Sequence, residues 1–258
     1  MTVFGAGIAA YGLFMACVAV STYAQNLTGF AFGLILLGLV AMLHVVPIAD
    51  AANAAMLLTL VNAWSYFRLH RVRPPWRLMR PVLLSSLIGV ALGVALLDLL
   101  GSTSLHWLRG LLGVCIVACA AMLLLQTKSR STMSNPRSFV MVGVLSGILG
   151  GLFSSSGPPL VYHLYRQPLA TQVVRNCLLL AFAANAAARL VLIGASGQFS
   201  ARAGLLSLCA MPVVYGVTRL NHRFPSKASP VVLRYAVAAL LLLAGGILVA
   251  TASKALLT

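Results

Sequence analysis

Acidic residues are almost absent from this chain of 258 residues. It contains two of them, Asp50 and Asp98, and charged residues of both signs make up 8% of the sequence. A soluble domain of this length needs far more polar surface to stay dissolved, so the composition excludes an ordinary soluble protein. With so few carboxylates there is also no convergent nucleophile or acid/base set, and we predict that the protein is not an enzyme.

Cysteine is present but forms no pattern typical of metal binding or redox chemistry. The five cysteines all lie inside apolar runs, and no Cys-x-x-Cys pair or Cys/His cluster of zinc spacing occurs. Cysteines in such surroundings usually behave as small hydrophobic residues. We therefore predict no metal site and no cofactor.

Long hydrophobic runs dominate instead. The hydrophobic fraction is 61% and the mean hydropathy is +1.01. Eight runs have about the length that crosses the hydrocarbon core of a bilayer, namely 3–22, 27–46, 50–67, 82–100, 107–125, 171–195, 203–218 and 232–251. Between 139 and 168 lies a shorter, interrupted pair. These runs predict an all-α polytopic membrane protein with about eight full spans and a broken or re-entrant helical hairpin.

The net charge of +16 comes from basic residues that are grouped between the apolar runs. The groups fall at 68–80, 128–137, 166–175 and 219–234, and both acidic residues lie toward the opposite side. Because cytoplasmic loops of membrane proteins are enriched in Lys and Arg, we expect these groups in the cytoplasm and both termini outside. No basic domain or stacking platform is present, so we predict no binding to nucleic acid.

Polar residues recur at a fixed spacing in the two halves of the chain. Asn53 and Asn62 are matched by Asn176 and Asn185, at an offset of 123 in both cases (176 − 53 and 185 − 62). The loop after the first pair is strongly basic and the loop after the second is nearly neutral, so equivalent loops face opposite sides of the membrane. This is typical of two inverted-topology repeats, the architecture of many secondary transporters. The predicted units are repeats at 1–126 and 139–258 and a cytoplasmic linker at 127–138.

A tip rich in serine and proline interrupts the second half at Ser154-Ser155-Ser156-Gly157-Pro158-Pro159. The leg that follows, 157–168, is ~18 Å long if helical and too short to cross the core, which predicts a broken helix with its tip inside the membrane. Non-helical backbone at that depth lines a cavity or is buried in protein, and a helix start favours an anion. The alternative is that these small residues only let helices pack closely. The predicted substrate-binding residues are Ser154, Ser155, Ser156 and Gly157 and, in the corresponding stretch of the first half, Gln25, Asn26 and Thr28.

Amides inside the apolar runs provide the other predicted contacts to a solute. An amide in a membrane helix is costly unless it is hydrogen-bonded, and its NH2 group can donate to the oxygens of an anion. Arg175 either attracts anions or extends to the surface as a topology anchor. Arg189 shares a face with Asn185 nearer the outer end of its run, and the same two interpretations apply to it. We add Arg175 to the predicted substrate-binding residues, with Asn53, Asn62, Asn176 and Asn185, for which hydrogen bonds between helices are the alternative.

Several stretches resemble one known family, the sulfite exporter TauE/SafE family. The glycine-rich segment from Gly143 to Tyr162, with its Gly-Pro-Pro tip, looks like the second-half motif of that family, although Ser155 and Ser156 stand where the family usually carries a glycine. The stretches 28–33 and 108–113 are similar to its first half. The resemblance covers nearly the whole chain. It implies a membrane transporter that exports sulfite or an organosulfonate such as sulfoacetate across the cytoplasmic (inner) membrane of a bacterium.

The charge inventory independently favours an anion as the solute, because cation and proton-coupled carriers normally keep an acid in the pathway. An inside-negative membrane potential drives an anion outward with about 2.3 kcal/mol per charge per 100 mV, so export needs no coupling ion. The partners expected are a small anionic substrate and the lipid bilayer, and the sequence leaves open whether copies form a homo-oligomer. The alternatives are a carrier of the same fold for another small anion or a metal, an intramembrane enzyme, and a membrane assembly factor.

The opposite orientation of the two halves can be tested by labelling. Single cysteines introduced at 70–76 are expected to react with a membrane-impermeant thiol reagent only after permeabilisation, and those at 196–200 in intact cells, because the two loops lie on opposite faces. The five native cysteines are first replaced by serine or alanine to remove background labelling. Labelling of both loops from one face would contradict the inverted arrangement.

Overall fold

The computed structural model describes residues 8–70, 75–101, 105–124, 131–154, 157–197, 199–224 and 230–257. These residues form ten α-helices and contain no β-strand, so the prediction of an all-α protein is confirmed. In chain order the helices are α1 (Ile8–Thr28), α2 (Phe32–Leu43), α3 (Ile48–His70), α4 (Trp76–Gly101), α5 (Leu105–Leu124), α6 (Pro136–Phe153), α7 (Gly157–Tyr165), α8 (Thr171–Ala195), α9 (Ala201–Arg223) and α10 (Pro230–Leu257).

Four helical stretches in the described parts of the chain are long and apolar enough to cross a membrane. They are Trp76–Leu97 of α4 and the full lengths of α6, α8 and α9. The chain is therefore a multi-pass membrane protein. The long helices α1 and α3 are not among these four, and each carries a row of buried polar side chains: Ser21, Thr22, Gln25 and Asn26 in α1, and Asn53, Thr59, Asn62 and Ser65 in α3. Both helices therefore turn a polar side toward the protein interior.

The apolar run 27–46 is not a single span, which corrects the interpretation made from the sequence. The chain leaves helical geometry between α1 and α2, and α2 has 12 residues, so this helix is ~18 Å long. Helix α7 has nine residues and is ~14 Å long, as short as the sequence indicates. Neither helix crosses a core of about 30 Å, so eight full spans are not confirmed.

The ten helices form two sets of five with matching breaks. In each set a long helix is followed by a break, a short helix and three long helices. The breaks contain Ala31 and Ser154, both left-handed, with φ of 78° and 55°. These residues are 123 apart (154 − 31), and the first residues of α3 and α8 are also 123 apart (171 − 48). This is the spacing of the paired asparagines.

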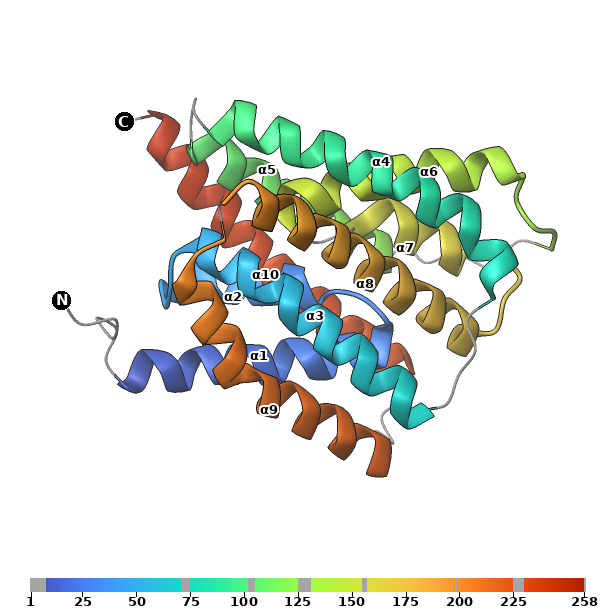
Figure 1. Cartoon of the computed structure of the whole chain (residues 1–258), viewed down its shortest axis with the longest axis horizontal. Coiled ribbons are helices and arrows are strands. Elements are labelled where there is room, and N and C mark those ends of the chain that lie inside the picture. The colour runs from blue at the N-terminus through green and yellow to red at the C-terminus, as the bar shows by residue number, and fades with distance from the viewer. Residues whose placement is uncertain are drawn as a thin grey trace.

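The packing partners of the helices also correspond between the sets. Helix α4 packs on α6, and their counterparts α9 and α1 pack on each other. Helix α3 packs on α9 and α8 on α4, while α3 with α8, and α5 with α10, pack on their own counterparts. In Figure 1, α3 runs from left to right and α8 from right to left, and α9 and α4 are opposed in the same way. Corresponding helices of the two sets therefore run in opposite directions.

A seam of glycines brings α4 and α6 into backbone contact. A Cβ atom on Gly89 would lie 2.9 Å from the Cα atom of Gly147, and one on Gly93 would lie 3.0 Å from the Cα atom of Gly151. A Cβ on Gly143 would collide with the hydroxyl of a serine on α4. These glycines permit close packing of the two helices.

A matched pair of alanine substitutions tests this seam. Both Gly93→Ala and Gly216→Ala gain about 1 kcal/mol in helix propensity, but a Cβ on Gly216 meets no atom within 4 Å. We expect Gly216→Ala to leave the thermal unfolding midpoint in detergent unchanged or raised. Gly93→Ala is expected to lower the midpoint, since overpacking costs about 1–3 kcal/mol. Equal midpoints would show that α4 and α6 are not in backbone contact.

Candidate functional site

A small cavity lies where the two helix breaks meet. Its volume is about 10 Å³, room for about one water molecule. It is lined by Gln25, Ala31, Phe32, Gly33, Thr59, Gly150, Ser154, Phe182, Asn185 and Ala186.

The cavity lies between the two sets of helices and takes equivalent residues from both. Thr59 is the central residue of α3, and Phe182 is next to the centre of α8. The two are 123 apart (182 − 59), the spacing that also separates the break residues Ala31 and Ser154. The cavity is therefore lined by the middle of both long helices and by both breaks.

Buried amides form a hydrogen-bonded network beside the cavity. Asn62 donates from Nδ2 to Oε1 of Gln25 at 2.7 Å, and the Thr218 hydroxyl donates to Oδ1 of Asn62 at 2.7 Å. Asn26 donates from Nδ2 to the same hydroxyl at 3.0 Å, and all four side chains are at most 1% exposed. The network joins α1, α3 and α9, and it fixes the orientation of the Gln25 amide at the cavity wall.

Asn185 occupies the equivalent place on α8 and lines the cavity directly. Its Oδ1 accepts a hydrogen bond from the Ser86 hydroxyl of α4 at 2.7 Å. Asn62 and Asn185 thus bond across to corresponding helices, α9 and α4. Hydrogen bonding between helices, the alternative considered for these residues, therefore coexists with a cavity-lining position for Asn185.

The serine tip is only partly described. Ser154 ends α6, lines the cavity, and donates from its hydroxyl to the Ala52 carbonyl of α3 at 2.9 Å. Gly157 begins α7 and is buried. Ser155 and Ser156 lie outside the described residues.

Gln25, Asn26 and Thr28 belong to helix α1 and not to a non-helical tip, which corrects the prediction. The helix continues because the Thr28 hydroxyl bonds to the Ala24 carbonyl at 2.7 Å and the Gly29 N–H bonds to the Gln25 carbonyl at 2.6 Å. The break follows at Gly29, whose φ of 82° is typical of the glycine that ends a helix.

Three more of the predicted residues lie outside the cavity lining, as Asn26, Thr28, Asn62 and Gly157 do. Asn53 and Asn176 are buried at 8% and 3% exposure, and Asn176 accepts a hydrogen bond from Gln172 one turn earlier, at 3.3 Å. Arg175 is half-buried and packs behind the first break, where a Cβ on Gly29 would lie 2.8 Å from its Cα atom. These residues flank the site.

The burial of the Arg189 side chain was not predicted from the sequence. The side chain does not extend to the surface, since it is 2% exposed and its Nε donates to the Gly151 carbonyl at 2.6 Å. The lining residues Thr59 and Phe182 were also missed, although a signal existed. Each precedes a paired asparagine by three residues and so shares its helix face.

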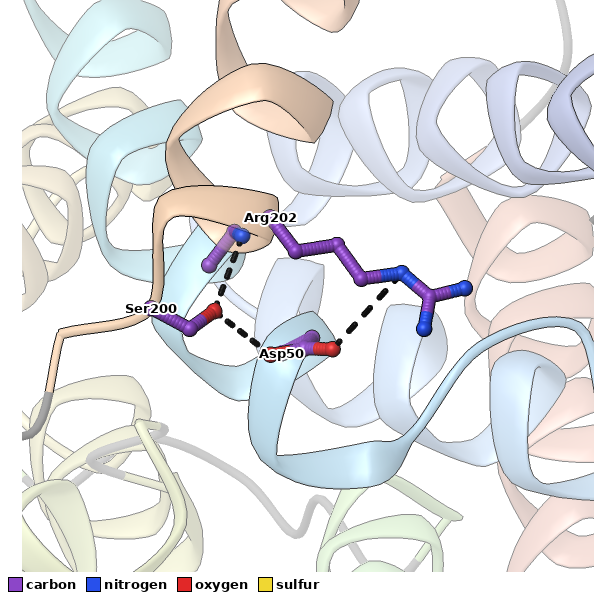
Figure 2. Close-up of polar contacts among 4 residues, drawn as sticks. Asp50, Ser200 and Arg202 are labelled. Atoms are coloured by element: carbon purple, nitrogen blue, oxygen red, sulfur yellow. Dashed lines mark hydrogen bonds and ion pairs between the residues drawn. The ribbon is translucent and has the colours of Figure 1, made fainter. Parts of the chain in front are cut away.

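Of the two carboxylates in the chain, the structure describes the side chain of Asp50. This side chain stabilises the starts of α3 and α9 and does not line the cavity. Figure 2 shows its contacts at the beginning of α9. The Ser200 hydroxyl donates to Asp50 at 2.6 Å and accepts from the N–H of Ala203 at 3.0 Å, while Nε of Arg202 lies 3.9 Å from the second carboxylate oxygen. Among the described residues, no group of three or more His, Cys, Asp or Glu could hold a metal ion.

A central cavity bounded by two helix breaks and buried amides, inside a bundle of apolar helices, is typical of a membrane transporter for a small solute. The sequence matches the family described as "Sulfite exporter TauE/SafE" over residues 13–248, and the chain belongs to this family. A relative from Cupriavidus necator, described as "Probable sulfite/organosulfonate exporter TauE", is 32% identical over 219 residues, 85% of this chain and 86% of that protein. No solved structure matches the chain. The resemblance noted above is confirmed, and the family is one of exporters and not of enzymes.

A double-mutant cycle tests the amide network. Asn62→Leu and Thr218→Val remove the two partners of one hydrogen bond, so the loss in unfolding free energy of the double variant is expected to fall short of the sum by about 0.5–3 kcal/mol. The control pair is Asn185→Leu with Thr218→Val, since Asn185 bonds to Ser86 on another helix. That pair is expected to be additive. Additivity in both pairs would contradict the network.

Proposed function

We propose that this chain exports sulfite or an organosulfonate across the bacterial cytoplasmic membrane. The observation that carries the proposal is the central cavity, whose described polar lining consists of amides and hydroxyls that can donate to an oxyanion, with no described carboxylate in it. Membership of the sulfite exporter family and the description of the Cupriavidus necator relative agree with it. The second candidate is another small oxyanion, which the same donors would accept.

Gln25, Ser154 and Asn185 are the proposed substrate contacts among the residues predicted from the sequence, because they line the cavity. Asn62 and Asn26 act through Gln25 and Thr218, so they are positioning residues in this proposal. Gly157 begins the short helix after the second tip, and Thr28 precedes the first break. Asn53, Arg175 and Asn176 are proposed to border the access route.

The two sets of helices are proposed to be inverted repeats at 1–126 and 139–258. The matching helix order, the common offset and the opposite directions in Figure 1 support this. The last turns of α3 and α9 contain Arg68, His70, His222 and Arg223, and Figure 1 has both helix ends on the right. Basic helix ends on one side support the orientation in which that side is cytoplasmic. The start of α1 and the end of α10 lie on the left, the proposed outer side.

The cavity does not accommodate the proposed substrate in this conformation. Its volume of about 10 Å³ is too small for a sulfur atom with three oxygens. Transport therefore requires that the helices around it separate, first toward one side and then toward the other. Inverted repeats are suited to this because the same movement in either set opens opposite faces.

Export is proposed to be uniport driven by the membrane potential. Neither His44 nor His163 lines the cavity. His44 is exposed at the end of α2, and the ring of His163 packs edge-on against Phe139, with centroids 4.6 Å apart. A group outside the cavity is poorly placed to couple a proton to the solute.

Flux measurements in liposomes test the proposed substrate and the proposed uniport mechanism. Sulfite efflux by the purified protein is expected to accelerate when a potassium diffusion potential makes the lumen negative, and to need no pH gradient. His44→Ala and His163→Gln are expected to retain this flux, with liposomes lacking protein as the blank. Sulfate, sulfoacetate and taurine are compared in the same assay to define the substrate.

The outcomes separate the proposals. If the folded protein transports no sulfur anion, the proposed function is refuted. Flux that requires a pH gradient, or that is lost in a folded histidine variant, would refute uniport alone.

A further inference from the structure

Arg189 is a cation buried in a membrane helix, and part of its hydrogen-bonding capacity has no partner among the described residues. Its side chain is 2% exposed, and Nε donates to the Gly151 carbonyl at 2.6 Å. Nη1 is buried and has no hydrogen-bond partner among the described residues. The salt bridge within the described part of the chain joins Asp50 to Arg202, and Arg189 takes part in no salt bridge described there. An unpaired charge at this depth is costly and is therefore usually functional.

Arg189 does not line the cavity itself, but it is adjacent to two places that do. Arg189 follows Asn185 by one turn of α8, so the two side chains share a face. Its acceptor Gly151 is the neighbour of Gly150, and both Asn185 and Gly150 line the cavity. Gly151 also lies in the last turn of α6, where carbonyl groups lack helical partners and the helix dipole favours a cation.

The hydrogen bond to the end of α6 does not account for all the N–H donors of the Arg189 side chain. A guanidinium carries five N–H donors, and the bond to Gly151 uses one of them. In the other set of helices the equivalent position is Tyr66 (189 − 66 = 123), a neutral residue that is buried to 1% exposure. Its hydroxyl accepts a hydrogen bond from Gln172 at 2.7 Å. The fold therefore does not require a charged residue at this position. Arg189 adds a charge on α8 that its counterpart Tyr66 on α3 lacks.

We propose that Arg189 recognises the negative charge of the substrate. In the opened cavity its free N–H groups donate to oxygens of the sulfur oxyanion, beside the amide of Asn185 and the hydroxyl of Ser154. The guanidinium fork suits the trigonal face of a sulfite or sulfonate group because it can donate two parallel hydrogen bonds. This assignment rests on the proposed export of a sulfur oxyanion and names the charged group that binds it.

Two substitutions separate charge from hydrogen bonding. Arg189→Lys keeps the charge and loses the fork, whereas Arg189→Gln keeps N–H donors for the Gly151 carbonyl and loses the charge. In liposomes the KM for sulfite is expected to rise about 10- to 100-fold in Arg189→Gln, the range expected for a charge-assisted hydrogen bond. Arg189→Lys is expected to show a smaller rise. The thermal midpoints of both variants are measured in parallel, and the exposed Arg137→Gln serves as a control for the change in net charge.

The opposite ranking would overturn the assignment. A purely structural cap predicts that Arg189→Gln transports sulfite with a wild-type KM, or better than Arg189→Lys. If Arg189→Gln does not fold, Arg189→Lys decides: a raised KM at an unchanged thermal midpoint supports the assignment, and an unchanged KM refutes it.

A second control addresses the other carboxylate of the chain. If Arg189 served only to neutralise Asp98, then Asp98→Asn would restore sulfite flux to Arg189→Gln, and this result would also overturn the assignment. We expect no restoration. Failure of the wild-type protein to carry any sulfur anion would refute the proposed function, whereas normal wild-type flux with indifferent Arg189 variants would refute this assignment alone.

Discussion

A chain that leaves helical geometry inside the hydrocarbon layer has to satisfy its backbone N–H and C=O groups within the protein, and this requirement determines how the two helix sets meet. At the first break Tyr165 donates from its hydroxyl to the last carbonyl of α1 at 2.8 Å, and the backbone of Arg175 covers Gly29. At the second break the Ser154 hydroxyl donates to Ala52. Each break is thus closed by residues of the other set, so neither set is complete alone.

The same interface provides the polar groups that a solute would meet. Amides that join helices, such as Asn185 with Ser86, stand beside break residues at one small cavity. The described carboxylate, Asp50, is kept at the start of α9 by Ser200 and lies outside the cavity lining. The described polar lining consists of amides and hydroxyls, which agrees with the proposal of a negative solute.

Hydropathy and spacing predicted much of this architecture, and local conformation explains what they missed. The run 171–195 coincides with α8, and the 123-residue offset of the asparagines recurs in the break residues Ala31 and Ser154. The break before α2 was misplaced because the residues around Ala31 are as apolar as a helix interior, and alanine gives no signal for a left-handed conformation. Arg189 was misjudged because its burial depends on a carbonyl of α6, a contact that no spacing along α8 reveals.

The glycine seam restricts which parts of the molecule can move independently. Where two helices touch through their main chains, as at Gly93 and Gly151, no side-chain rotation can absorb relative sliding, so α4 and α6 behave as one stiff body. Their counterparts α9 and α1 have no such contact at these glycines, since a Cβ atom on Gly216 or Gly12 would meet no atom within 4 Å. The two helix pairs, each with one helix from either half of the chain, are therefore unequal: α4 and α6 meet through their main chains, and α1 and α9 are linked by side chains such as Asn26 and Thr218.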